Sequence, residues 1–406
     1  VINGTLALLD NSVARFDPAT NSIQLDLYWR ALAPSTEDIS FNLQVTDAVG
    51  ETVFSLDREH PDGVYPTSQL PVGMTVRDRH TLALPPGTPP GVYTVRVAGY
   101  RHGDPNTRLP VDGQNDAFIV AQTVQVGVPE RSARGSPPPS EVMIDQSMTD
   151  GVVLNGATLP VKRIRVGEYF PLTLAWRAEV APRSDHSVCF GAAPVRNGSV
   201  ATTTLELGCQ PLIAAWPTSR WQVGDAWRVP YRVKLPPELG TGEYQWLIRV
   251  GQNSVTPGQI MIDAPPRIFA DPGPTVRQTA VFSDAGELIG FTTAATADRG
   301  APFEVKLVWL ATRATSEKYT VFAQLVDANG ERVAGHDGGP DGERQPTSAW
   351  LPGTYVIDSH WIDLPAGLTP GDYRIVIGMY ETYTLRRLPL QSGPDSIELS
   401  ARVRVK

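Results

Sequence analysis

Three acidic residues near the C-terminus have the chemistry of a calcium site. Asp337, Asp341 and Glu343 fall in a glycine-rich segment that is expected to form a turn. Carboxylate oxygens on a turn are ligands that Ca²⁺ accepts, although their spacing does not match the twelve-residue EF-hand loop. The alternative is a set of solvated turn carboxylates. The sequence offers this one metal candidate and predicts no cofactor.

The only two cysteines, Cys189 and Cys209, form the second candidate for chemistry. They are expected on neighbouring strands of one hairpin. In an exported protein they would form a disulfide that contributes ~3 kcal/mol by restricting the unfolded chain. The alternative is a pair of buried thiols. Two cysteines without partner histidines do not make a zinc site.

Two tryptophans, Trp221 and Trp350, are candidates for sugar binding. Each follows a Pro-Thr-Ser triplet by two residues. An aromatic face on a loop can stack on a sugar ring, whereas a buried indole would instead cover an edge of the fold. The equivalent position near the N-terminus is Leu70, which favours apolar cover.

Catalytic motifs are missing from the sequence. The histidines lack metalloprotease spacing, and neither a nucleophile elbow nor a phosphate-binding loop is present. We therefore expect no catalytic residues, with an enzyme site at a domain junction as an alternative. The six histidines are His60, His80, His102, His186, His336 and His360.

These residues lie within a pattern that occurs three times. In every copy, 25 residues separate the proline of Pro-Thr-Ser from the glycine of a Gly-x-Tyr element, and a tryptophan lies 37 to 41 residues before that proline. A spacing held three times indicates a tandem repeat. The proline–glycine pairs are Pro66 and Gly91, Pro217 and Gly242, and Pro346 and Gly371; the upstream tryptophans are Trp29, Trp176 and Trp309.

Short alternating segments dominate each copy. Residues 23–29, 41–45 and 92–97 alternate apolar and polar side chains, as half-buried strands do, and the 36 glycines and 37 prolines supply many turns. No segment of twelve or more residues has a helical period. The sequence predicts an all-β chain of three tandem immunoglobulin-like β-sandwich domains joined by Pro-rich linkers.

The repeat also sets the expected boundaries. Unit 1 covers 1–128, unit 2 covers 141–264 and unit 3 covers 275–406. The linkers at 129–140 and 265–274 are Pro-rich and are expected to be extended and semi-rigid. Unit 2 is the divergent copy, because it contains both cysteines and lacks the Arg-Leu-Pro element that begins at Arg108 in unit 1 and at Arg387 in unit 3.

The repeated aromatic residues are expected to serve as framework. A tryptophan on an inner strand fills the space between two sheets, and a tyrosine after a glycine can bond its hydroxyl to nearby backbone, as in a tyrosine corner. The residues with this expected role are Trp29, Trp176, Trp309, Tyr93, Tyr244 and Tyr373.

Charge and hydropathy exclude some partners. The net charge is −8 and basic residues form no stripe, which argues against nucleic acid. No apolar run is long enough to cross a bilayer, and the chain starts at Val1 within the first repeat. We interpret the chain as a fragment whose targeting or membrane part precedes it.

The order of these motifs resembles a known repeat. The resemblance is carried by segment 28–31 (Tyr-Trp-Arg-Ala), segment 319–327, the Pro-Thr-Ser-x-Trp element, the Leu-Pro and Pro-Gly-x-Tyr elements and Arg-Leu-Pro. In this order they are similar to the β-sandwich repeats at the C-terminus of bacterial polytopic membrane proteins of the mannosyltransferase-like glycosyltransferase type. The resemblance implies transmembrane helices upstream and an extracytoplasmic location. It carries no catalytic residues to this chain.

We therefore expect a non-catalytic extracytoplasmic region of a membrane-anchored bacterial protein, acting as a spacer or docking module. Its partners would be its own membrane domain or cell-envelope protein or polysaccharide. The alternative is a module that binds cell-envelope carbohydrate or mediates adhesion.

Overall fold

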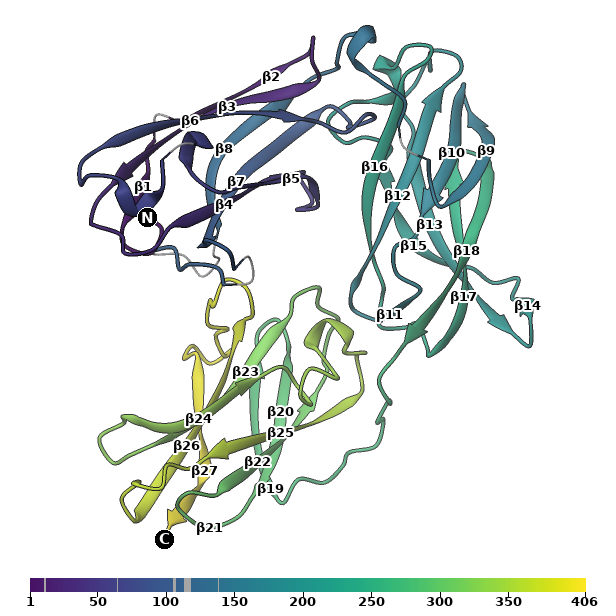
Figure 1. Cartoon of the computed structure of the whole chain (residues 1–406). Coiled ribbons are helices and arrows are strands. Elements are labelled where there is room, and N and C mark those ends of the chain that lie inside the picture. The colour runs from purple at the N-terminus through teal and green to yellow at the C-terminus, as the bar shows by residue number, and fades with distance from the viewer. Residues whose placement is uncertain (11, 64, 105–106, 113–117, 138) are drawn as a thin grey trace.

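The computed structural model describes residues 1–406 except 11, 64, 105–106, 113–117 and 138 (Figure 1). Within these residues the chain forms strands and short 3₁₀ helices and no α-helix, which confirms the prediction of an all-β chain. No helix in this described part has the length and apolar character needed to cross a bilayer. Pro138, in the first predicted linker, lies outside the described residues.

Unit 1 forms two antiparallel sheets. In one sheet β3 pairs with β6 along one edge and with β1 and β2 along the other; the second sheet has the order β5-β4-β7-β8. The strands are β1 (Leu6–Leu8), β2 (Val13–Asp17), β3 (Ser22–Ala31), β4 (Ile39–Thr46), β5 (Thr52–Arg58), β6 (Thr75–Ala83), β7 (Gly91–Arg101) and β8 (Phe118–Val126).

Unit 2 also forms two sheets. One has the order β16-β12-β10-β9, and the other has the order β11-β18-β17-β13, with β14 and β15 both paired to β13. The strands are β9 (Val142–Thr149), β10 (Val152–Thr158), β11 (Arg163–Arg165), β12 (Tyr169–Ala178), β13 (Ser187–Arg196), β14 (Ser199–Val200), β15 (Leu205–Pro211), β16 (Ala226–Lys234), β17 (Gly242–Val250) and β18 (Asn253–Asp263).

Unit 3 has sheets of order β19-β20-β22-β25 and β21-β27-β26-β23-β24. The strands are β19 (Val276–Phe282), β20 (Gly286–Thr293), β21 (Thr296–Ala297), β22 (Pro302–Leu310), β23 (Tyr319–Val326), β24 (Arg332–Gly338), β25 (Tyr355–Asp363), β26 (Gly371–Glu381) and β27 (Ser396–Val405). The short helices are η1 (Pro61–Gly63), η2 (Thr67–Gln69), η3 (Arg131–Ala133), η4 (Thr218–Arg220) and η5 (Thr347–Ala349).

Each pair of sheets encloses its own cluster of buried apolar side chains. In unit 1 the rings of Trp29 on β3 and Phe41 on β4 meet across the two sheets at 4.8 Å between centroids. Alternate residues of the tryptophan strands β3, β12 and β22 are buried, as their sequence alternation predicts. Two sheets that share one core have the arrangement of a β-sandwich.

The chain follows a bent path in Figure 1. Units 1 and 3, drawn purple to blue and green to yellow, lie on the same side of unit 2. The segment after β26 of unit 3 extends toward unit 1. Loops of all three units therefore surround one region beside β16.

Candidate functional site

The expected framework residues lie inside the cores. The three repeated tryptophans are at most 1% exposed. The three tyrosine hydroxyls donate to carbonyl oxygens four residues earlier: Tyr93 to Pro89 at 2.7 Å, Tyr244 to Gly240 at 3.2 Å and Tyr373 to Thr369 at 2.7 Å. The rings of these six residues are buried, and the tyrosine hydroxyls bond to backbone within their own units.

A buried polar cluster accompanies the tryptophan in units 1 and 3. Trp309 Nε1 donates to Asp358 Oδ2 at 3.1 Å, and His360 Nε2 lies 3.0 Å from the same oxygen. In unit 1, Trp29 Nε1 donates to Asp78 at 3.1 Å, and that carboxylate lies 2.8 Å from a histidine ring. The Asp-x-His pattern recurs 49 residues after the tryptophan in both units. Sequence reasoning missed this signal.

Unit 2 lacks the Asp-x-His pair, and its tryptophan bonds to a tyrosine hydroxyl instead. Val229 occupies the register position of the aspartate, and Tyr231 occupies that of the histidine. Trp176 Nε1 donates to the Tyr231 hydroxyl at 3.0 Å, and that hydroxyl donates to the Leu212 carbonyl at 2.6 Å. The indole N–H therefore has a partner in all three units, as a buried donor requires.

The histidine of unit 3 reaches a second histidine on the other sheet. His336 on β24 and His360 on β25 have their Nδ1 atoms 3.0 Å apart. Burial lowers the pKa of His336, and the nearby His360 lowers it further. A hydrogen bond between two ring nitrogens needs one proton between them, so this contact depends on a neutral imidazole.

The two tryptophans considered for sugar binding are buried. Trp221 is 2% exposed and Trp350 is 1% exposed, and their indole N–H groups donate to the carbonyls of Trp216 and Gln345. Neither presents an open ring face in this structure. They occupy the place of Leu70, which is also buried.

The Pro-Thr-Ser triplets form the same local structure three times. Each begins a short 3₁₀ helix, η2, η4 or η5. The threonine hydroxyl accepts a backbone N–H from the start of a strand 28 to 32 residues earlier, at 2.7 to 2.9 Å: Ile39 of β4 to Thr67, His186 just before β13 to Thr218, and Tyr319 of β23 to Thr347. The triplet is thus a structural connection.

Cys189 and Cys209 form a disulfide. They are direct partners in the antiparallel pair β13–β15, which matches the expected hairpin. The bond links the central strand β13 to β15 at the edge of its sheet.

The acidic residues of the calcium candidate have protein partners instead of a shared centre. Glu343 accepts the Gly339 N–H at 2.9 Å, Asp341 accepts Arg344, and Asp337 accepts the Tyr380 hydroxyl at 3.2 Å. Among the described residues, no three histidine, cysteine or carboxylate side chains are grouped as a metal site. Asp341 and Glu343 bond within the β24–η5 connection, and Asp337 bonds to β26.

Units 1 and 2 are joined by polar contacts at their junction. Arg134 in the first linker pairs with Asp225 of unit 2, whose side chain is 2% exposed. The Arg228 N–H donates to the Gly87 carbonyl at 2.8 Å, and Arg232 Nη1 donates to the Val49 carbonyl at 3.3 Å. These contacts join the first linker and two loops of unit 1 to unit 2.

Units 2 and 3 are joined still more closely. Arg267 in the second linker donates to the carbonyls of Pro237 at 2.7 Å and Ala349 at 2.9 Å. A side chain on Gly167 would come within 2.5 Å of the Ser348 backbone. Ala349 of unit 3 belongs to the apolar cluster of unit 2. This junction is packed like an interior.

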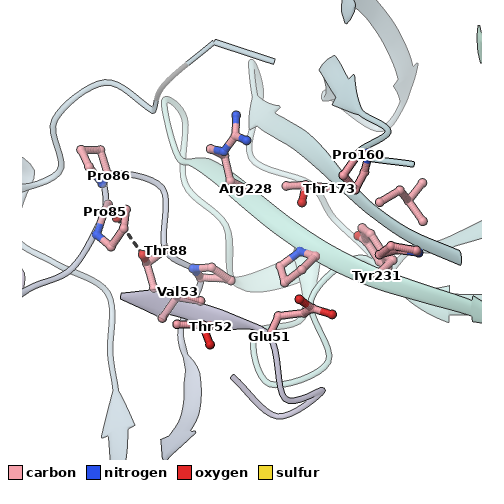
Figure 2. A pocket seen from close by; sticks show the side chains of 14 residues that line it. Glu51, Thr52, Val53, Pro85, Pro86, Thr88, Pro160, Thr173, Arg228 and Tyr231 are labelled. Carbon is pink, nitrogen blue, oxygen red and sulfur yellow. Dashed lines mark hydrogen bonds between the residues drawn. The ribbon is translucent and has the colours of Figure 1, made fainter. Parts of the chain in front are cut away.

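Two clefts lie between these junctions, along the outer face of β12 and β16. The first, shown in Figure 2, has a volume of about 330 Å³ and lies between unit 1 and unit 2. Its wall on unit 1 is formed by Glu51 to Val53 and the prolines of the β6–β7 connection, and Arg228 lies on the unit 2 side. The six prolines that line it are Pro85, Pro86, Pro89, Pro160, Pro171 and Pro230.

The second cleft, of about 780 Å³, is lined by all three units. Lys234 on β16 donates to the Gly167 carbonyl at 2.6 Å and to the Ser316 carbonyl at 3.2 Å. Its ammonium group lies 4.7 Å from the centre of the Tyr169 ring. Burial lowers the pKa of Lys234, and Lys318 across the cleft lowers it further.

The two clefts together, which we call the β16 trough, are the candidate functional site. Their lining contains proline rings, exposed tyrosines, cations and carboxylates, and none of the described lining residues is a histidine or cysteine. Rings beside charged groups suit the binding of a ligand. No sequence pattern indicates the trough, because its residues come from three units.

Comparison with known proteins returned no matching family model and no matching curated protein.

Proposed function

We propose that this chain is a non-catalytic, extracytoplasmic docking region built from three tandem immunoglobulin-like domains with Pro-rich linkers. It belongs to a membrane-anchored bacterial protein, with a glycosyltransferase-like membrane part as the attached enzyme. Its role is to hold the three units in a fixed arrangement and to present the β16 trough to a partner in the cell envelope.

The observation that carries this proposal is that an ion pair or hydrogen bonds fix each linker to the neighbouring units. Arg134 and Arg267 lie in linkers, yet the first pairs with buried Asp225 and the second donates to two carbonyls on different units. A flexible spacer needs no such bonds, whereas a scaffold that presents a composite surface does. The disulfide supports a location outside the reducing cytoplasm.

The location is tested by the redox state and accessibility of the native protein. Cells are quenched in acid, free thiols are alkylated, and the modification of Cys189 and Cys209 is measured by mass. We expect both cysteines to be oxidised, and the chain to be cleaved when intact spheroplasts are treated with a protease that spares a cytoplasmic marker. Reduced cysteines together with a protected chain would contradict an extracytoplasmic role.

A further inference from the structure

The outer face of β16 carries a row of cations. Arg228, Arg232 and Lys234 point to the same side of the strand, because alternate residues share a face, while the intervening residues are buried. The row spans about 20 Å at ~3.3 Å per residue. Lys318 of unit 3 extends it across the second cleft.

Four cationic side chains and three carboxylates line the trough, in a chain of net charge −8. The carboxylates already have partners: Glu51 lies 4.0 Å from Arg232, Glu168 accepts the Arg165 N–H at 3.4 Å and Glu317 accepts the Ser316 hydroxyl at 2.9 Å. Lys234 and Lys318 repel each other across a partly enclosed space, and Glu317 and Glu168 offset this repulsion in part. An anion between them would remove that repulsion.

The rings beside these cations offer stacking surfaces. Tyr383 is 72% exposed and Tyr169 is 43% exposed, and both line the cleft that holds the two lysines. In the first cleft the proline rings provide the apolar surface (Figure 2). A ligand that combines a ring with an anionic group would use both features.

The strand edge of β16 is closed to an added peptide strand. Pro230 has no N–H, and the Arg228 N–H is already bonded to Gly87 of unit 1. A peptide that pairs by β-augmentation needs those donors free. The trough therefore favours a ligand recognised through its rings and charges over one recognised through backbone pairing.

We propose that the β16 trough binds an acidic saccharide chain, with Arg232, Lys234 and Lys318 holding its anionic groups and Tyr383 packing on a sugar ring. This inference names a partner class for the proposed scaffold. It does not depend on the compartment of the chain, so the two proposals fail in different experiments.

The test measures binding of a galacturonic acid tetramer to the full chain by titration calorimetry. The matched ligand is the methyl-esterified tetramer, which has the same rings without the charge. We expect the acid to bind, the ester to bind at least about tenfold more weakly, and the affinity of the acid to fall as salt rises.

Variants assign the binding to the trough. Lys318→Ala and Tyr383→Ala should each weaken binding of the acid by about tenfold, while Lys162→Ala, which removes an exposed lysine of unit 2 outside the trough, should leave it unchanged. Lys318 and Tyr383 are used because Lys234 also joins two units. An unchanged thermal transition in each variant shows that the fold persists.

Three results with the tetramer would overturn the proposal. They are no measurable binding of the tetramer, equal binding of the acid and the ester, and equal loss of affinity in Lys162→Ala and Lys318→Ala. A tetraglutamate peptide is the last ligand to be titrated. If it binds as tightly as the galacturonic acid tetramer, the trough recognises charge alone and the assignment to a saccharide is wrong.

Discussion

At the scale of residues, the stability of a unit depends on a few buried polar side chains, and Asp358 is the clearest case. Its carboxylate is 1% exposed, accepts Trp309 and the Asp341 N–H, and lies beside His360. Removing a carboxylate at such a point leaves several buried donors without a partner. The repeated tryptophan is therefore positioned by a polar bond as well as by packing.

We predict that Asp358→Ala destabilises unit 3 by about 3–5 kcal/mol, because it breaks a buried, hydrogen-bonded charge cluster. The free energy of unfolding is measured by chemical denaturation. The control is Asp372→Ala, which removes a carboxylate from an exposed pair with Arg404 and should have a far smaller effect. Equal effects of the two variants would show that the buried cluster has no special role.

The contact between His336 and His360 makes the stability of unit 3 depend on pH. The pKa of His336 is lowered in the folded state by burial and by His360, and the carboxylates of Asp337, Asp358 and Asp363 oppose this in part. The unfolded chain therefore binds a proton more readily than the folded chain. The stabilisation is complete above the ordinary pKa of 6.5 and is lost as pH falls through the folded pKa.

We predict that the free energy of unfolding falls more steeply in the wild type than in His336→Asn between about pH 7.5 and about pH 5.5. Denaturant titrations at several pH values measure both slopes, and the difference removes the contribution of other groups. Parallel slopes would mean that His336 titrates alike in the folded and unfolded chain.

At the scale of elements, the disulfide holds β15 at the edge of its sheet. We predict that the double variant Cys189→Ser, Cys209→Ser lowers the stability of unit 2 by ~3 kcal/mol, because the bond closes a loop with a sequence separation of 20. Reductant should have the same effect on the wild type and none on the variant. Insensitivity of the wild type to reductant would contradict a stabilising bond.

Much of the fold was accessible from local sequence. Alternation predicts the strands β3, β4 and β7, and the Gly-x-Tyr element predicts the tyrosine that bonds to the backbone four residues earlier. The Arg-Leu-Pro element lies beside β7 and β26 through bonds of Leu109 and Leu388, and unit 2 has a tight β17–β18 hairpin there instead. The tyrosine hydroxyl and the leucine N–H each bond to a backbone carbonyl of their own unit.

The candidate site was not accessible in the same way. Its clefts depend on where three units meet, and no local pattern encodes that position. The burial of Trp221 and Trp350 was partly indicated by sequence, because unit 1 has Leu70 at the equivalent position. The buried Asp-x-His pairs could have been found, because their distance from the tryptophan is the same in units 1 and 3.

For the whole molecule, Gly167 tests how firmly units 2 and 3 are joined. Any side chain at this position would collide with the backbone of Ser348 and Ala349. Gly224 has a similar positive φ, +85° against +79°, with nothing within 4 Å, so it reproduces the backbone strain without the collision.

We predict that Gly167→Ala exposes Arg267 in the second linker to trypsin, while Gly224→Ala does not. In the wild type Arg267 is held by the carbonyls of Pro237 and Ala349. Limited proteolysis followed by mass spectrometry gives the rate of cleavage at this bond. Equal cleavage of both variants would attribute the effect to backbone strain.

The fixed arrangement of the three units is tested most directly by the distance between units 1 and 3 in solution. Spin labels at Thr123→Cys on β8 and Arg402→Cys on β27, both exposed positions, give the distribution of that distance. The native cysteines do not interfere, because they are joined in a disulfide. We predict one narrow distribution; a broad distribution, as from units on flexible tethers, would contradict the scaffold.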